Sequence, residues 1–186
     1  MKIAIITGSA GLIGSESVEF FSKKFDLIVG IDNNHREKFF GKDASVSWNI
    51  KRLSSEISNY KHNQVDIRDY ESLKGIFSEY GKDISLIIHT AAQPSHDWAA
   101  KEPLTDFTVN ANGTLNLLEL SRLFCPDSVF IFKEFTGSSN WTPHLGQHFE
   151  KTPLEIKPLH AGHFKSLYEY NRITKTKPIS TTIIYL

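Results

Sequence analysis

An α/β fold, in which a doubly wound parallel sheet carries helices on both faces, is the fold class that this sequence predicts. Short apolar runs recur along the first two-thirds of the chain, and stretches with helical periodicity separate them. Glycine-rich or polar turns stand between these segments. Strands and helices that alternate in this way form parallel sheets with right-handed crossovers.

The individual elements are expected in regular succession. Strands are predicted at residues 2–7, 26–32, 64–66, 84–89 and 128–132, mostly from runs of β-branched and other apolar residues. Helices are predicted at 12–24, 70–80 and 104–123, with a further short helix near 50–57. The pattern dissolves after residue 132, and only residues 181–186 resemble another strand. We therefore expect a folded domain at residues 1–132 and a truncated or divergent tail at 133–186.

The composition argues against several classes of protein. The 21 basic and 21 acidic residues balance, so no net charge would recruit nucleic acid or an anionic membrane. No stretch approaches the ~20 apolar residues that a membrane span requires. The single cysteine, Cys125, has no disulfide partner and no ligand at metal-binding spacing. We expect no metal site and a reducing, cytoplasmic setting.

A glycine-rich turn follows the first predicted strand. Residues 7–14 read TGSAGLIG and carry the spacing Gly-x-x-Gly-x-x-Gly. Glycines let the backbone approach a pyrophosphate closely, and the free amides of the following helix meet the anion at the positive end of the helix dipole. Because the turn joins a buried strand to a helix, it predicts a Rossmann-type, dinucleotide-binding domain. The predicted ligand-binding residues of the turn are Gly8, Gly11, Leu12, Ile13 and Gly14.

Two acidic residues stand at the ends of the next predicted strands. Asp32 lies 18 residues beyond Gly14, where a carboxylate accepts from both ribose hydroxyls and repels a 2′-phosphate, which favours NAD over NADP. Arg36 leaves the alternative open, since a nearby guanidinium can receive that phosphate. Asp66 is placed to accept from the adenine amino group, although such an acid is also a common helix N-cap, the role expected for Asp69. The neighbours Asn33 and Ile67 complete the predicted cofactor contacts.

The segment after the fourth predicted strand carries a resemblance to a known family. Residues 89–93 read HTAAQ, and residues 109–114 read VNANGT. With the glycine turn and the second-strand acid, they resemble the extended short-chain dehydrogenase/reductases, the NAD-dependent nucleotide-sugar epimerase and dehydratase group. The longer runs at 89–100 and 106–114 resemble its CDP-paratose 2-epimerase (CDP-tyvelose epimerase) branch. The resemblance covers residues 1–132.

This resemblance implies roles for further residues. Small side chains at Ala91 and Ala92 let the dinucleotide lie flat across the strand ends, and Gln93 and Asn110 would support the cofactor site. Gln93, Ser95 and His96 would lie near the nicotinamide and the sugar. For His96, a loop histidine bonded to backbone is an equal alternative.

The implied activity is transient oxidation of a sugar carbon by tightly held NAD, followed by hydride return to the opposite face. A CDP-sugar would be the substrate. A homodimer would form through helices, with 104–123 as the candidate unless that apolar stripe is core. The alternatives are another nucleotide-sugar epimerase or dehydratase, a non-catalytic NAD-binding module, and a remnant that binds nothing.

The tail departs from the pattern of that group. The group's chemistry needs a Ser or Thr just after the fifth strand and a Tyr-x-x-x-Lys on the next helix, where lysine lowers the tyrosine pKa. Beyond the fifth predicted strand, Arg172 follows Tyr168 by four residues and Thr174 follows Tyr170. We therefore assign no catalytic residue, and no metal site to His144 and His148. The substrate domain is missing too, so we expect a truncated or frame-disrupted relative that is inactive alone.

Overall fold

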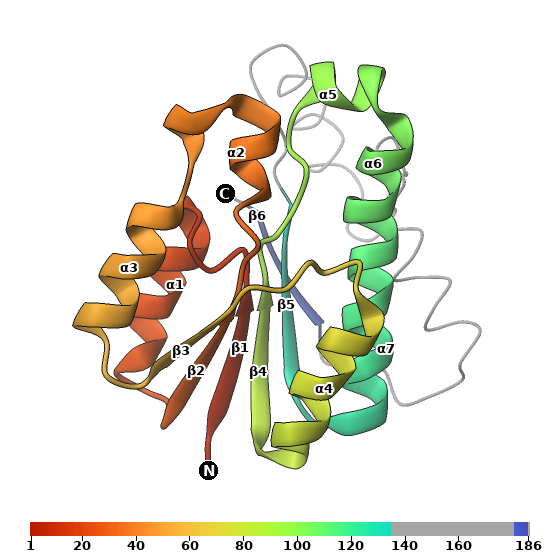
Figure 1. The fold of residues 1–186 in the computed structure, drawn as a ribbon. Helices are drawn as coiled ribbons and strands as arrows, with labels where there is room; N and C mark the ends of the chain where they lie inside the picture. The colour runs from red at the N-terminus through yellow and green to blue at the C-terminus, as the bar shows by residue number, and fades with distance from the viewer. Residues whose placement is uncertain (135–180, 186) are drawn as a thin grey trace, which may run out of the picture.

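Parallel strands form the sheet at the centre of the computed structural model, which describes residues 1–134 and 181–185 (Figure 1). Within those ranges the sheet has six strands in the order β3-β2-β1-β4-β5-β6, and every neighbouring pair is parallel. The strands are β1 (Ile3–Thr7), β2 (Leu27–Ile31), β3 (Tyr60–Asn63), β4 (Ile84–His89), β5 (Val129–Glu134) and β6 (Thr181–Tyr185). The predicted α/β fold with a parallel sheet is confirmed.

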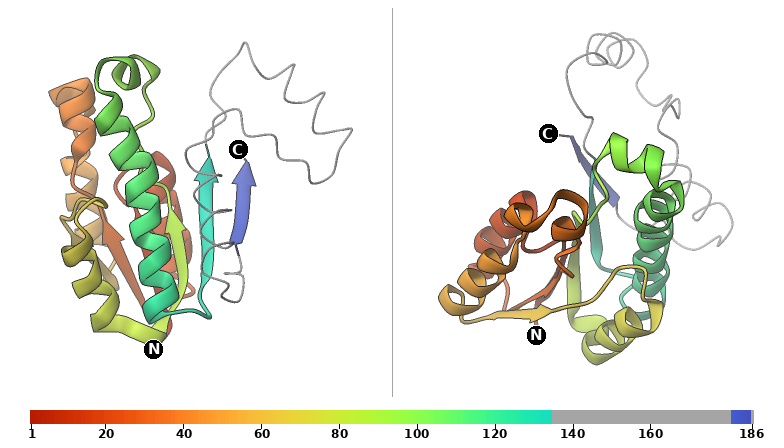
Figure 2. Two further views of the ribbon diagram at one scale, coloured as in Figure 1. Left: turned by 90° about the vertical axis from the view of Figure 1, so that its right-hand side faces the viewer. Right: turned by 45° about the horizontal axis from the view of Figure 1, so that its top comes forward.

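Helices cover both faces of this sheet, as Figure 2 shows from two directions. The α-helices are α1 (Leu12–Ser22), α2 (His35–Phe40), α3 (Ser47–Glu56), α4 (Tyr70–Tyr80), α5 (His96–Lys101), α6 (Pro103–Phe107) and α7 (Gly113–Phe124). Two 3-10 turns, η1 (Lys42–Ala44) and η2 (Gly81–Asp83), and a π-helical segment, η3 (Thr108–Asn112), complete the set. Helices α2 and α5 lie beyond the carboxyl ends of the strands (Figure 1).

Side chains along β1 point alternately to the two faces of the sheet and so belong to two separate apolar clusters. Ile3 and Ile5 belong to the apolar cluster under α4 and α7, whereas Ala4 and Ile6 belong to the cluster under α1 and α3. All four side chains are fully buried. Because side chains alternate between the faces of a strand, a central strand covered on both sides must be apolar at every position.

Three of the predicted elements need correction. The third strand is Tyr60–Asn63 and not 64–66, so Asp66 lies in the loop that follows it. The first helix ends at Ser22, two residues before its expected end, and α2 was not predicted. The single helix expected at 104–123 is divided into α6, η3 and α7, which follow one another without a break.

The strand predicted at 181–186 is present as β6. It lies beside β5, with Phe130 opposite Thr181 and Phe132 opposite Ile183. The end of the expected tail therefore adds a strand to the sheet. The segment 135–180 lies outside the described residues.

Candidate functional site

A cleft of about 420 Å³ lies at the carboxyl ends of the strands. The chain leaves β1 toward one layer of helices and β4 toward the other, and such switch points are where open α/β sheets bind ligands. The cleft is lined by Gly8, Gly11, Leu12, Ile13, Gly14, Ile31, Asp32, Asn33, His35, Arg36, Phe39, Phe40, Val46, Val65, Asp66, Ile67, Thr90, Ala91, Ala92, Pro94 and Val109. Twelve of the cofactor residues predicted from the sequence are among them.

The glycine turn forms one wall of the cleft, and two of its glycines are required by close packing. Gly8 has a φ of 65°, and a Cβ there would lie 2.8 Å from the backbone nitrogen of Ala91. A Cβ on Gly14 would lie 2.0 Å from the carbonyl oxygen of Gly8. Gly11 is less constrained, with a Cβ contact of 3.3 Å to the same oxygen. The turn can adopt this shape because Gly8 and Gly14 lack side chains.

The amino-terminal end of α1 opens directly into the cleft. Gly11 precedes the helix and supplies no side-chain cap, and the first i to i−4 bond runs from the Ser15 amide to the Gly11 carbonyl at 2.9 Å. The amides of the three preceding residues, Leu12, Ile13 and Gly14, therefore belong to the unsatisfied first turn of the helix. Free amides and the positive end of the helix dipole suit this point to an anion such as a pyrophosphate.

Asp32 faces the glycine turn from the end of β2. Its Oδ2 accepts from the Ala10 amide at 3.1 Å, and its Oδ1 accepts from the Asn34 amide at 2.8 Å. These bonds fix the carboxylate and leave acceptor capacity on each oxygen. A carboxylate held in this way is suited to two neighbouring hydroxyls. On the same wall, the Arg36 guanidinium lies 5.2 Å from the ring centroid of Phe40, a cation–π contact.

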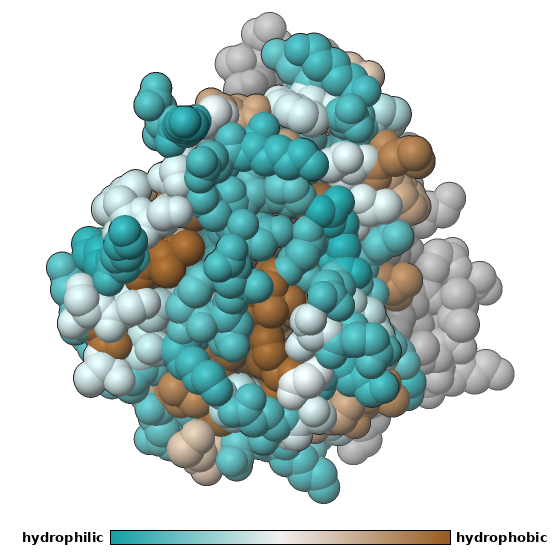
Figure 3. Space-filling view, viewed as in Figure 1, coloured by the Kyte–Doolittle hydropathy of each residue, from teal (hydrophilic) through white to brown (hydrophobic). Residues whose placement is uncertain are grey.

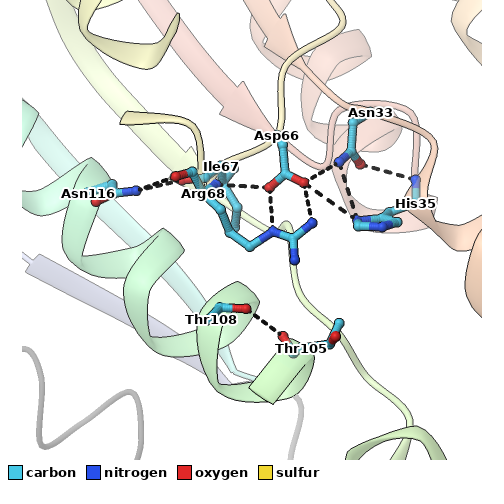
Figure 4. Close-up of polar contacts among 8 residues, drawn as sticks. All are labelled: Asn33, His35, Asp66, Ile67, Arg68, Thr105, Thr108 and Asn116. Carbon is cyan, nitrogen blue, oxygen red and sulfur yellow. Dashed lines mark hydrogen bonds and ion pairs between the residues drawn. The ribbon is translucent and has the colours of Figure 1, made fainter. Parts of the chain in front are cut away.

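Asp66 is held in a network of donors (Figure 4). Its Oδ1 accepts from the Arg68 amide and Nε, both at 2.9 Å, and its Oδ2 accepts from Arg68 Nη2 at 2.6 Å and Asn33 Nδ2 at 3.0 Å. Burial opposes ionisation of Asp66, but the hydrogen bonds and charge of Arg68 outweigh it, so the pKa of this carboxyl lies below its ordinary value. Asp66 is therefore a fixed anion on the cleft wall.

His35 lies beside this network. Its Nδ1 is 3.7 Å from Asp66 Oδ2, and its ring stacks on Phe39 at 4.8 Å between centroids. Burial, and to a smaller extent the positive charge of Arg68, lower the pKa of His35. The imidazole is therefore neutral near pH 7 and contributes a flat aromatic surface to the cleft.

Helix α7 supports the loop that carries Ile67 (Figure 4). Asn116 Nδ2 donates to the carbonyl oxygens of Ile67 and Arg68, at 3.0 and 3.3 Å. A Cβ on Gly113 would lie 2.5 Å from Ile67 Cδ1, so this side chain packs directly on the helix backbone. The helix motif recognised in the sequence thus positions a wall of the cleft.

Gln93 and Asn110 lie behind the cleft wall and are not among its lining residues. Gln93 is buried, and its backbone amide donates to Asn110 Oδ1 at 2.9 Å. Asn110 Nδ2 in turn donates to the backbone carbonyl of Gln93 at 3.1 Å. Ser95 caps α5 by accepting from the Trp98 amide, and His96 begins that helix. The structure thus gives Gln93 and Asn110 a supporting position for the loop that carries Ala91 and Ala92.

The cleft contains residues that the sequence reasoning missed, among them several from α2 and the segment after it. His35, Phe39 and Phe40 come from α2 itself, and Val46 comes from the loop after it. Trp98 anchors this helix through a bond from Nε1 to the Phe39 carbonyl at 2.6 Å. The signal available in the sequence was the apolar Phe39-Phe40 pair inside an otherwise polar stretch.

A Tyr-x-x-x-Lys spacing occurs at Tyr70 and Lys74, before the fifth strand, and the sequence reasoning missed it. Both residues are on α4, where Tyr70 packs against the core and Lys74 Nζ lies 3.6 Å from Glu71. Neither lines the cleft, so we assign them no catalytic role. Tyr168, Tyr170, Arg172, Thr174, His144 and His148 lie outside the described residues.

Within residues 1–134 and 181–185, no three His, Cys, Asp or Glu side chains gather as a metal site would require. In the same ranges, no helix combines the length and the apolar composition needed to cross a bilayer.

Comparison with known proteins identifies a matching family model and similar proteins. The family model described as the NAD dependent epimerase/dehydratase family matches residues 4–174. A UDP-glucuronate 4-epimerase of Thermodesulfobacterium geofontis is 35% identical over 125 residues, which are 67% of this chain and 36% of that protein. A CDP-paratose 2-epimerase of Salmonella typhi is 34% identical over 125 residues, 67% of this chain and 33% of that protein. The chain thus spans about a third of the length of these relatives.

Solved structures show the same fold. The UDP-Glc/GlcNAc 4-epimerase of Campylobacter jejuni superposes with a TM-score of 0.71 at 22% identity, over 100% of this chain and 53% of that one. The UDP-glucose 4-epimerase of Thermotoga maritima gives 0.68 at 24% identity, over 98% of this chain and 54% of that one. The glycine turn, the strand-end acid and the matched family model lead to one conclusion: this chain belongs to the NAD-dependent epimerase/dehydratase family.

Proposed function

We propose that residues 1–132 form the NAD-binding unit of a nucleotide-sugar epimerase. The observation that carries this proposal is the arrangement of the cleft. The uncapped first turn of α1 and the Asp32 carboxylate face the same cavity, one suited to phosphates and the other to ribose hydroxyls. NAD, the cofactor of this family, would accept hydride from a sugar carbon and return it.

The chain's own residues divide the binding work between the parts of the dinucleotide. Amides of Leu12, Ile13 and Gly14 bind the pyrophosphate, and Gly8 and Gly11 let it approach the turn. Asp32 accepts from the adenosine ribose and repels a 2′-phosphate, while Arg36 lies nearby. The adenine wall consists of Asn33, Asp66 and Ile67, and the small Ala91 and Ala92 leave room for the nicotinamide half.

The proposal extends to the substrate, the residues near it and the location of the protein. We propose a CDP-sugar as the substrate, with UDP-sugars as the alternative, because both kinds of epimerase are among the similar proteins. Gln93, Ser95 and His96 are the proposed substrate-side residues. A cytoplasmic location accords with the single cysteine.

A homodimer would use the outer face of α6 and α7. Apolar patches are visible over these helices in Figure 3, and Leu104, Phe107 and Leu115 are exposed there. Other side chains of the same helical stretch, Val109 and Leu118, are in the core. The stripe expected at 104–123 thus serves the core on one side and leaves an apolar surface on the other.

A second candidate function is NAD binding without catalysis. The observation that favours it is in the sequence: beyond β5, Tyr168 and Tyr170 are followed at the fourth position by Arg172 and Thr174 in place of lysine. The two candidates share the cofactor site and differ in turnover, so one binding experiment tests both and a turnover assay separates them.

The experiment is a thermal melt of the purified chain with NAD⁺, with NADP⁺ and without nucleotide. A ligand at about 100 times its dissociation constant adds about 2.7 kcal/mol to the stability of a folded binder. We expect a shift with NAD⁺ and a smaller one with NADP⁺. The same melting temperature in all three samples would refute the cofactor site. Product formation from CDP- or UDP-sugars would then distinguish the epimerase from the non-catalytic module.

A further inference from the structure

Helix α3 sends one buried polar side chain toward the glycine turn. Asn49 is 4% exposed, and its Nδ2 donates to the carbonyl oxygen of Ala10 at 2.9 Å. Ala10 lies in the turn, directly before Gly11, whereas Asn49 does not line the cleft. A helix on the far side of the turn thus holds it by its backbone.

Ala10 is held on its other side by the residue proposed to bind ribose. The backbone amide of Ala10 donates to Asp32 Oδ2 at 3.1 Å, and Ala10 is 2% exposed. Asn49, Ala10 and Asp32 therefore form a continuous chain of hydrogen bonds from α3 to the cleft. A shift of the Ala10 backbone would move the Asp32 carboxylate and the start of α1 together.

The orientation of the Asn49 carboxamide is fixed by its second partner. Asn49 Oδ1 accepts from Arg52 Nε at 2.9 Å, and a guanidinium can only donate. The nitrogen of the amide must therefore face the Ala10 carbonyl. Arg52 is itself held by Glu19 of α1, with Nη2 2.7 Å from the carboxylate. The donor is aimed before any ligand arrives.

We propose that Asn49 is a positioning residue for the dinucleotide. It keeps the glycine turn in the shape in which Asp32 and the first amides of α1 meet the cofactor, without touching the cofactor itself. This inference rests on the proposed function and adds to it a residue from a helix that the cleft does not include.

A second asparagine provides a matched control for a purely structural role. Asn59 Nδ2 donates to the carbonyl oxygens of Ser22 and Phe25, both at 2.9 Å, and is partly buried. These carbonyls belong to the opposite end of α1, away from the cleft. Asn59 therefore performs the same chemistry, a carboxamide bonded to backbone carbonyls of the α1 region, without a path to Asp32.

The test compares Asn49→Ala, Asn49→Asp and Asn59→Ala in the full chain by NAD⁺ titration calorimetry. Asn49→Asp keeps the size of the side chain but replaces the donor with an oxygen, so it serves if the alanine variant fails to fold. We expect both Asn49 variants to bind NAD⁺ about threefold to tenfold more weakly, the value of one hydrogen bond. Asn59→Ala should lower the melting temperature and leave NAD⁺ affinity within about twofold of wild type.

Equal NAD⁺ affinity in the Asn49 variants and Asn59→Ala would overturn the inference. Hydrogen exchange gives a readout that does not depend on the cofactor. The Ala10 and Asn34 amides, which both donate to Asp32, should exchange faster in Asn49→Ala than in Asn59→Ala. If the wild-type chain binds no NAD⁺, the proposed function fails, and this exchange decides the positioning role alone: equal rates would refute it.

Discussion

Replacement of Gly14 by alanine tests the shape of the phosphate turn directly. The added Cβ would stand 2.0 Å from the Gly8 carbonyl oxygen and 2.8 Å from the Ser9 Cα, whereas ordinary contacts begin at 3.4 Å. Both neighbours are backbone atoms of the same turn, so no side-chain rotation relieves the contact. The turn must move away from α1, and overpacking of this kind costs about 1–3 kcal/mol.

The assay for Gly14→Ala is NAD⁺ titration together with a thermal melt. We expect a lower melting temperature and NAD⁺ affinity reduced by at least about tenfold, because the displaced amides no longer converge on the pyrophosphate. Gly75→Ala on α4 is the control, since nothing lies within 4 Å of its added Cβ and the residue does not line the cleft. NAD⁺ binding by Gly14→Ala at wild-type strength would refute the placement of the phosphates at this turn.

Three further predictions concern the surroundings of the turn. Gly30→Ala should lower stability by about 1–3 kcal/mol in a denaturant melt, because its Cβ would lie 2.4 Å from the Tyr60 ring; an unchanged midpoint would contradict this. Asp32→Asn should reduce the ratio of NAD⁺ to NADP⁺ affinity by at least about tenfold, since the repulsion of a 2′-phosphate is lost; an unchanged ratio would remove Asp32 from ribose recognition. Burial raises the pKa of Tyr60 to about 12 from 10.0, so its stabilising contribution is present below pH 10.0 and is lost as the pH rises toward 12. Phenolate absorbance and a melt series compared with Tyr60→Phe measure that loss, and ionisation of Tyr60 near pH 10.0 would count against it.

The strands that the sequence predicted well are those covered on both faces. β1 and β4 are apolar almost throughout, because each lies inside the sheet with helices on both sides. β3 is an edge strand whose sequence, YKHN, contains one apolar side chain. Its position is determined by pairing with β2 and by Tyr60, which occupies the space that Gly30 leaves. Such long-range partners have no signature within four residues of sequence.

The candidate site shows the same division. The glycine turn and Asp32 were predicted because each follows an apolar strand at a characteristic spacing. His35 and Phe39 were missed because α2 has only six residues and begins after Asn34 in a left-handed conformation. Tertiary contacts stabilise that helix, including the bond from Trp98, 59 positions along the chain, to the Phe39 carbonyl. A short helix held by a distant residue lacks the periodicity on which sequence reasoning depends.

The pairing of β1 with β4 has a consequence for the order of refolding. Thr7 and His89 are 82 residues apart in the sequence, and Thr7 Oγ1 lies 2.7 Å from His89 Nδ1 across these two strands. Contacts of such long range form slowly, because the intervening chain must lose conformational entropy before the contact can stabilise it. Helical signal should therefore appear early after dilution from denaturant, and the capacity to bind nucleotide should appear late. Nucleotide binding is then a kinetic marker of completed folding and not of the glycine turn alone.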